Sequence, residues 1–270
     1  MLGRPVRVTG RAPLAGGYVA ASVERVDLDV AGRRGSVVLK TASPVEVAAV
    51  RAVAAVPGAE PVALAAGPGW LVLPLRSGPP LGPDQPVPDA VWDLLARVHA
   101  HWWTRRPDGV PVVDAAWWGR LCERTLVAVR GASARTGERE FAAAERALLS
   151  WGADPRVAAA LARLPATLVH GDAHRGNVLG DALIDWGNAR VAPPGLDLAT
   201  LRAQGAADTS RYEETLARCG VRPAPGLGAL QRDWADVQVH VQYLGFAADH
   251  LGAARVAEMI GTAAAALARL

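Results

Sequence analysis

The sequence predicts an α+β protein, with a smaller β-rich N-terminal part, residues 1–75, and a larger, mainly helical C-terminal part, residues 76–270. Three observations lead to this prediction. Valine-rich runs dominate the first part and are typical of strands. From residue 88 onward, apolar residues recur every three or four positions, as in amphipathic helices. Between the two parts, residues 76–88 contain five prolines and form the clearest linker in the chain.

The N-terminal part begins with a predicted hairpin. Residues 17–30 are rich in valine and lead into the turn sequence Ala-Gly-Arg-Arg-Gly, after which residues 36–40 resume as a strand. Residues 43–56 have a Ser-Pro helix start and apolar residues at helical spacing, so they predict a helix. Residues 69–75 predict a further short apolar strand.

The C-terminal part is predicted to be helical except for one segment. We expect helices at residues 88–103, 114–131, 138–151 and 155–164, and again from residue 196 to the C-terminus. The interruption, residues 166–199, holds two short strands joined by Gly180 and Asp181, a pair typical of hairpin turns. Polar residues concentrate on both sides of this hairpin, and the functional residues are therefore expected here.

Composition excludes several classes of protein. The formal net charge is +3 and the basic residues are scattered, so nucleic acid is not an expected partner. No run approaches the roughly 20 apolar residues of a membrane span. Two cysteines, Cys122 and Cys219, exclude a disulfide framework. The first residues lack the apolar stretch of a secretory signal, so we expect a cytoplasmic protein, and no obligate protein partner is evident.

One residue stands out in this composition. Of the 29 basic residues, 28 are arginines and one, Lys40, is a lysine. In a chain that uses arginine for its surface cations, a single ammonium group indicates a site where a compact point charge works and a planar guanidinium does not.

Asp172, Asn177 and Asp185 carry side chains that phosphoryl transfer requires. That reaction needs a carboxylate to accept the proton of an attacking hydroxyl, oxygen ligands for Mg²⁺, and a cation on the nucleotide phosphates. The spacing D-x-x-x-x-N supplies the base and one metal ligand from a single loop, and Asp185, across the hairpin, reaches the same metal. Lys40 would supply the cation, and Glu46 would hold its ammonium group.

The segments VHGDAHRGNVL, LIDWGNA and PPGLDLA resemble the aminoglycoside phosphotransferase family, which has the bilobal protein-kinase-like fold. The resemblance covers nearly the whole chain and is looser in residues 1–75. It implies a nucleotide-binding lobe at residues 1–75 and a lobe with the catalytic loop and acceptor pocket at residues 76–270. It also implies Mg²⁺ as the cofactor and ATP or GTP as the phosphoryl donor.

The resemblance implies roles for individual residues as well. Asp172 is the catalytic base, and Asn177 and Asp185 bind Mg²⁺. Lys40, paired with Glu46, contacts the α- and β-phosphates. Pro74 and Arg76 belong to the interlobe hinge, which holds the purine through backbone groups. Gly16 and Gly17 belong to the loop that covers the phosphates. Around the catalytic loop, His170 is expected to support the backbone, His174 to do the same or approach the substrate, and Asp197 to brace the loop.

Other interpretations of these residues stay open at this point. His170, Asp172 and His174 form the pattern H-x-D-x-H, which on a strand would place three zinc ligands on one face. Arg175 would either bind a phosphate or be solvated. Asp197, if it does not brace the loop, would be only a helix N-cap. The histidines predicted on helices (His99, His101, His240 and His250) are expected to be ordinary, partly buried residues. Both cysteines are expected to be small core residues.

The acceptor is expected to be a small molecule without a high positive charge. Residues 196–270 contain eight carboxylates and seven arginines in mixed order, whereas a polycationic aminoglycoside needs a dense acidic pocket. The expected function is a kinase acting on a hydroxyl of an antibiotic or related sugar-bearing compound. The alternatives are a metabolic kinase for an amino alcohol or a sugar, and a regulatory protein that binds a nucleotide without transferring its phosphate.

Overall fold

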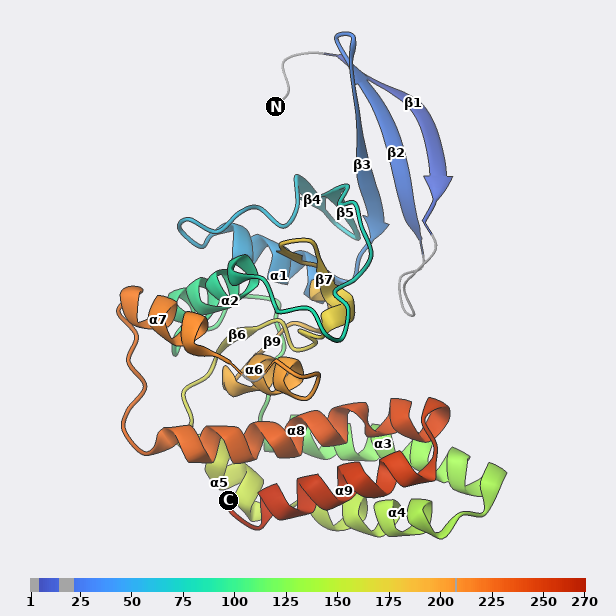
Figure 1. Ribbon diagram of the computed structural model, residues 1–270, viewed down its shortest axis with the longest axis vertical. Coiled ribbons are helices and arrows are strands. Elements are labelled where there is room, and N and C mark those ends of the chain that lie inside the picture. Colours follow the sequence, from blue (N-terminus) through green and yellow to red (C-terminus); the bar gives the residue numbers. More distant parts are fainter. Residues whose placement is uncertain (1–4, 15–21, 207) are drawn as a thin grey trace.

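The computed structural model describes residues 5–14, 22–206 and 208–270, in which a sheet-bearing part stands on a helical part (Figure 1). The strands are β1 (Val6–Pro13), β2 (Val23–Val30), β3 (Arg33–Thr41), β4 (Ala65–Gly67), β5 (Trp70–Pro74), β6 (Thr167–Val169), β7 (Val178–Leu179), β8 (Ala182–Leu183) and β9 (Arg190–Ala192). The α-helices are α1 (Pro44–Ala54), α2 (Asp89–His101), α3 (Ala115–Thr136), α4 (Arg139–Trp151), α5 (Pro155–Arg163), α6 (Gly195–Arg202), α7 (Ser210–Arg218), α8 (Leu227–His250) and α9 (Ala253–Leu267). Two short 3-10 helices are η1 (Arg175–Asn177) and η2 (Trp186–Asn188).

The first five strands form one antiparallel sheet in the order β1-β2-β3-β5-β4. The predicted hairpin is β2–β3, but its turn is shorter than expected. Only Ala31 (φ 53°) and Gly32 (φ 82°) form it, and residues 33–35, expected in the turn, belong to β3. Positive φ at both turn residues gives the backbone twist that matches the twist of the two strands.

The sequence analysis did not predict β1 and β4. β1 is an exposed edge strand whose register with β2 shifts between Val8 and Gly10, and β4 has three residues, so neither presents a valine-rich run. The strand expected from residue 17 begins at Val23. Gly16 and Gly17, the expected phosphate-covering loop, lie outside the described residues.

Helix α1 follows β3 directly and carries Glu46 on its first turn. The Ser43 hydroxyl accepts a hydrogen bond from the Glu46 N–H (3.1 Å), and Pro44 occupies the first turn, where its missing N–H costs nothing. The buried valines of this helix share an apolar core with α2 and with Trp186 of η2. The same core therefore supports the sheet-bearing part and the segment predicted to carry function.

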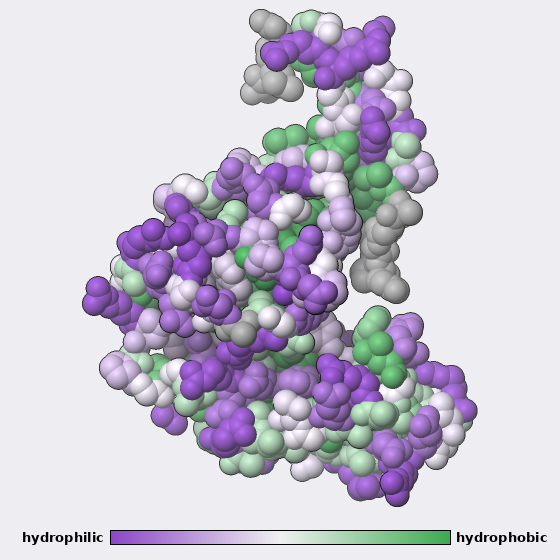
Figure 2. Space-filling view, in the orientation of Figure 1, coloured by the Kyte–Doolittle hydropathy of each residue, from purple (hydrophilic) through white to green (hydrophobic). Residues whose placement is uncertain are grey.

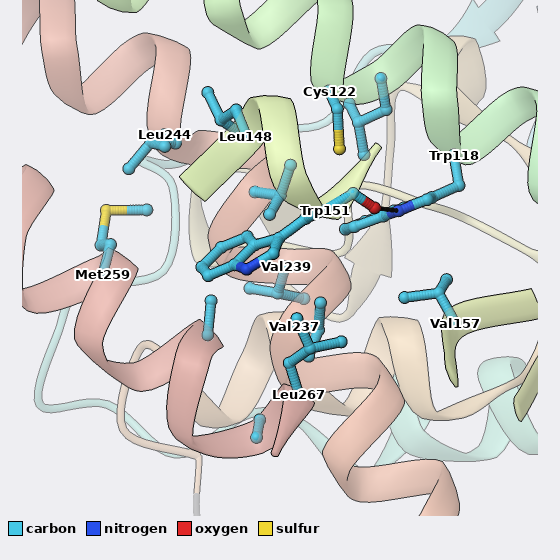
Figure 3. Close-up of a cluster of buried hydrophobic side chains, with 14 of the residues drawn as sticks. Trp118, Cys122, Leu148, Trp151, Val157, Val237, Val239, Leu244, Met259 and Leu267 are labelled. Carbon is cyan, nitrogen blue, oxygen red and sulfur yellow. Dashed lines mark hydrogen bonds between the residues drawn. The ribbon is translucent and has the colours of Figure 1, made fainter. Parts of the chain in front are cut away.

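Four long helices, α3, α4, α8 and α9, build the base of the molecule (Figure 1). Their apolar faces meet in a second core, in which Trp118 and Trp151 lie close together (Figure 3). The indole N–H of Trp118 donates to the Trp151 carbonyl (2.7 Å), which satisfies the polar atom of a side chain that is only 2% exposed. No helix in the described ranges combines the length and apolarity that crossing a membrane requires.

The segment between α5 and α6 forms two small antiparallel ladders. β7 and β8 are the predicted hairpin, with Gly180 in its turn at φ 60°. β6 pairs with β9, from Thr167 opposite Ala192 to Val169 opposite Arg190. This second pair, which was not predicted from the sequence, encloses residues 170–189, and the start of the loop 170–177 lies on Asp197 of α6.

Candidate active site

The loop 170–177 is held in place by one buried carboxylate. Asp197, on the first turn of α6, accepts hydrogen bonds from the backbone N–H groups of His170 and Gly171, each at 2.8 Å. Its Oδ2 also lies 3.2 Å from Nε2 of His99. Gly171 has φ 77°, and a Cβ there would lie 2.2 Å from the Asn188 carbonyl, so only glycine fits. Asp197 is therefore part of the loop's support and not a helix cap.

His170 lies inside the same support and is uncharged at neutral pH. Burial lowers the pKa of His170, although the Asp197 charge opposes this effect. In the neutral tautomer, Nε2 donates to the Ile184 carbonyl (2.8 Å) and Nδ1 accepts from the Asp172 N–H (3.3 Å). With both ring nitrogens engaged, and with the pattern H-x-D-x-H on a loop instead of a strand, the zinc interpretation is not supported.

The Asp172 carboxylate points at groups from α8, from η2 and from its own loop. Oδ1 accepts a hydrogen bond from the Tyr243 hydroxyl of α8, and Oδ2 accepts one from the Asn188 side-chain amide (3.0 Å). Nε2 of His174 lies 4.0 Å from Oδ2. The backbone carbonyl of Asp172 accepts a hydrogen bond from the Asn177 side-chain amide (2.9 Å), which ties the two ends of the loop together.

Lys40 joins the sheet to the hairpin. Its ammonium group lies 2.7 Å from Oε1 of Glu46 and 2.8 Å from Oδ1 of Asp185. Burial works to lower the pKa of Lys40, but its hydrogen bonds to the two carboxylates outweigh this effect and raise it. Burial raises the pKa of Glu46, whereas that of Asp185 is lowered because the Lys40 hydrogen bond and charge overcome its burial. The predicted pair of Lys40 and Glu46 is thus present, with Asp185 as a second partner.

A cavity of about 560 Å³ opens beside this ion pair. Its walls are largely apolar, and Lys40, Glu46 and Asp185 contribute charged groups to them. Pro74 and Arg76 also line it, and the Arg76 guanidinium lies 3.4 Å from Asp181 in the hairpin turn. The apolar side chains on its walls include Val23, Val38, Leu71, Leu73 and Leu183.

The structure thus gathers the predicted site residues in two neighbouring groups. Lys40, Glu46, Pro74, Arg76 and Asp185 line the cavity. His170, Asp172, His174 and Asn177 belong to the loop, and Asp197 of α6 holds it. The Ile184 backbone connects the groups, because its N–H donates to the Asn177 carbonyl (2.8 Å) and its carbonyl accepts from His170. Asn177 and Asp185 offer amide and carboxylate oxygens, the hard ligands that suit Mg²⁺.

Several predictions about single residues are wrong. Arg175 is neither solvated nor available to a phosphate, because its guanidinium donates to the backbone carbonyls of Gln204 (2.7 Å), Gly82 (2.7 Å) and Gln85 (2.5 Å). Cys219 is exposed at the end of α7, while Cys122 is buried as expected. His250, expected to be partly buried, is exposed because it is the last residue of α8.

Three residues that form hydrogen bonds with the loop 170–177 were not predicted from the sequence: Asn188, Gln242 and Tyr243. Asn188 follows Asp185 by three residues, and this spacing was the signal available for it. Tyr243 and Gln242 lie 71 residues after the loop positions they contact, and nothing in the local sequence indicates this. His99, expected to be partly buried, is fully buried and bonds to Tyr212 as well as Asp197.

Comparison with known proteins agrees with this geometry. The sequence profile of the phosphotransferase enzyme family, APH, matches residues 12–231. The chain belongs to this family. No curated protein matches the sequence.

Solved structures share the fold at low sequence identity. A macrolide 2′-phosphotransferase type I is 20% identical with a TM-score of 0.52, covering 98% of this chain and 92% of its own. A choline/ethanolamine kinase family protein from Mesorhizobium loti is 18% identical with a TM-score of 0.53, covering 97% of this chain and 87% of its own. A spectinomycin phosphotransferase, solved with ADP and spectinomycin, is 13% identical with a TM-score of 0.52, covering 96% and 93%. The α+β fold is therefore the bilobal, protein-kinase-like fold of the phosphotransferases.

Proposed function

We propose that this protein is a Mg²⁺-dependent small-molecule kinase that transfers the γ-phosphoryl group of ATP or GTP to a hydroxyl of an antibiotic or related sugar-bearing compound. Residues 1–75 would bind the nucleotide, and residues 76–270 would hold the catalytic loop and the acceptor. The observation that carries the proposal is the Lys40 ammonium, held by Glu46 and Asp185 at the wall of a cavity that adjoins the Asp172 loop.

Each group has a defined part in this reaction. The apolar walls of the cavity would take the purine, with the backbone around Pro74 and Arg76 at its edge. Lys40 would contact the α- and β-phosphates. Asn177 and Asp185 would hold Mg²⁺, which neutralises phosphate charge when bound. The Asp172 carboxylate would orient the acceptor hydroxyl and accept its proton as the oxygen attacks the γ-phosphorus in line with the leaving oxygen.

The pairing of the C-terminal carboxylates supports an acceptor without a high positive charge. Four of them already face arginines: Asp233 with Arg269 (2.7 Å), Asp236 with Arg202 (3.3 Å), Asp249 with Arg135 (2.7 Å) and Glu258 with Arg255 (2.6 Å). A carboxylate that is neutralised in this way attracts a polycation weakly. Asp197 is buried beneath the loop and is unable to contact an acceptor.

Mass spectrometry on a mixed panel of antibiotics, sugars and amino alcohols tests the proposal. The protein is incubated with Mg²⁺ and either ATP or GTP, and phosphorylated products are identified. We expect a phosphoryl adduct on a macrolide, nucleoside or other weakly charged compound, and none with Asp172→Ala, which should still bind nucleotide. An adduct on an amino alcohol would favour the metabolic kinase instead. Nucleotide binding without any adduct would favour the regulatory protein.

A further inference from the structure

The Asp172 carboxylate is bonded to a tyrosine that belongs to a distant helix. Tyr243 is part of α8, and its hydroxyl meets Oδ1 of Asp172. A carboxylate only accepts hydrogen bonds, so the phenol is the donor. Burial raises the pKa of Tyr243, and so does the nearby Asp172 charge, which keeps the phenol protonated.

Helix α8 is fixed to the loop at the neighbouring position as well. The Gln242 side-chain amide donates to the Gly171 carbonyl (2.8 Å), and the Arg190 guanidinium donates to the same carbonyl (2.7 Å). Arg190 in turn lies over the ring of Trp117 on α3, 4.9 Å from its centre. The position of Tyr243 relative to Asp172 is therefore set by three side chains from β9 and the helical bundle.

The two carboxylate oxygens consequently have different surroundings. Oδ1 is occupied by the Tyr243 hydroxyl, whereas Oδ2 has the Asn188 amide at 3.0 Å and the His174 ring at 4.0 Å. The Asp172 side chain is 19% exposed, so part of the carboxylate is open to an incoming group.

The face of α8 beyond Tyr243 continues away from the loop. Phe246 and His250 lie three and seven positions further on, on the same side of the helix, with ring centres 4.7 Å apart. Phe246 is 47% exposed, and Figure 2 shows a hydrophobic patch over this end of α8. An acceptor that presents its hydroxyl to Asp172 along this face would meet aromatic surface.

We propose that Tyr243 is a positioning residue: it holds Oδ1 of Asp172, so that Oδ2 receives the proton of the acceptor hydroxyl. This inference rests on the proposed kinase function. In the step, the acceptor O–H bond breaks and its proton goes to Oδ2, while the acceptor oxygen forms a bond to the γ-phosphorus. The bond between that phosphorus and the bridging oxygen breaks, and the nucleoside diphosphate leaves with the electron pair.

Tyr243→Phe removes the hydroxyl and keeps the ring. We expect kcat for the acceptor to fall roughly 10- to 100-fold, because a hydrogen bond to a charged group is lost. The KM for the nucleotide should stay within about twofold of the wild-type value, since Tyr243 does not line the cavity. The ratio of phosphoryl transfer to nucleotide hydrolysis should also fall, because water needs less orientation than a bulky acceptor.

Thr125→Val is the matched control. It also removes a buried hydroxyl, which donates to the Val241 carbonyl of α8 at 3.2 Å, but one that touches neither the Asp172 carboxylate nor the groups that hold the loop. It should lower stability without lowering the ratio of transfer to hydrolysis. Equal ratios for Tyr243→Phe and the wild-type protein would overturn the inference while leaving the kinase function in place.

A second measurement does not depend on activity. Fluorotyrosine placed at position 243 keeps the ring and hydroxyl and provides a ¹⁹F resonance. This resonance should shift when Asp172 is replaced by Asn, since the group that accepts the phenol hydrogen bond changes. No shift would overturn the inference even before an acceptor is known. Failure of the wild-type protein to phosphorylate any acceptor would instead overturn the proposed function, and the inference with it.

Discussion

Lys40 is the residue whose type matters most for the proposed chemistry. Its ammonium lies between Glu46 and Asp185, at 2.7 and 2.8 Å, and the residue is only 8% exposed. A guanidinium is larger and planar, so it would push against both carboxylates in this space. The use of a lysine here, in a chain of arginines, then has a steric explanation.

Lys40→Arg should therefore reduce kcat/KM for the nucleotide by roughly 10- to 100-fold while preserving charge. Steady-state kinetics with Arg51→Lys as the control would check this, because Arg51 is an exposed residue of the adjoining helix. Equal activity of Lys40→Arg and the wild-type protein would mean that the single lysine is accidental.

His170 gives the protein a pH-dependent stability. Its pKa is lowered from 6.5 by burial, so the unfolded chain takes up a proton at a higher pH than the folded protein does. The stability contributed by neutral His170 is present above about pH 6.5 and is lost as pH falls toward the folded-state pKa. Urea unfolding at pH 7.5 and 5.5 should show a lower free energy at pH 5.5, by up to about 1.4 kcal/mol per pH unit within that window. In the His170→Gln variant, the free energy of unfolding should differ much less between the two pH values than it does in the wild-type protein. If the difference were equal in both proteins, His170 would be excluded as its source.

The pair of Lys40 and Glu46 was predictable from the sequence, but most other contacts of the candidate site residues were not. The spacing of Asp172, Asn177 and Asp185 indicates a phosphate and metal site because few reactions need that set of oxygens. Tyr243 has no comparable signal, because a tyrosine on an amphipathic helix is usually a packing residue. Arg175 was misjudged for the same reason: its partners are backbone carbonyls, which any sequence supplies.

Among the elements, the long ones were predictable and the short ones were not. Helices such as α3 and α8 present several turns of apolar periodicity, and Asp114 caps α3 by accepting from the Trp117 N–H (2.7 Å). β6 and β9 have three residues each and are buried, so they show no alternation. Such strands owe their existence to the packing around the loop and not to local propensity.

Helix α8 carries a polar group inside its apolar face. Gln238 is fully buried, and neither atom of its amide finds a hydrogen-bond partner among the described residues. Leaving a buried amide unpaired costs about 1–3 kcal/mol. Gln238→Met keeps the length of the side chain and removes this cost, so we expect the free energy of unfolding to rise by about 1–2 kcal/mol.

Chemical denaturation would measure this change, with Gln238→Ala as the comparison. The alanine variant also removes the amide, but it leaves a cavity and should be less stable than the methionine variant by about 1–3 kcal/mol. A methionine variant less stable than the wild-type protein would show that the amide is satisfied after all.

At the scale of the whole molecule, one arginine ties the linker to the loop 170–177. The linker 76–88 connects the sheet to α2, and Leu81 donates its N–H to the Val178 carbonyl (3.0 Å) of the hairpin. Arg175, 8% exposed, donates to the linker carbonyls of Gly82 and Gln85. Its bond to the Gln204 carbonyl adds the end of α6 to the same cluster.

This cluster explains why the proline-rich linker does not separate two independent units. From the sequence, residues 76–88 are predicted to be a linker, because prolines and glycines interrupt every regular pattern. In the structure, the buried Arg175 guanidinium donates hydrogen bonds to two backbone carbonyls of that segment. These bonds take the place of the regular backbone hydrogen bonds of a helix or sheet. The apolar core shared by α1, α2 and the hairpin then extends across the boundary.

Arg175→Met should consequently weaken the whole fold and not only the loop. Removing a charged donor leaves three partly buried carbonyls without this partner, and we expect the free energy of unfolding to fall by about 1–3 kcal/mol. Limited proteolysis should cut within residues 76–88 faster than in the wild-type protein. Arg202→Met is the control, because the Arg202 pair with Asp236 is partly exposed and worth less than about 1 kcal/mol. If the two variants lost equal stability and the linker stayed protected, the prolines alone would hold the linker in place and Arg175 would be dispensable for joining the two parts.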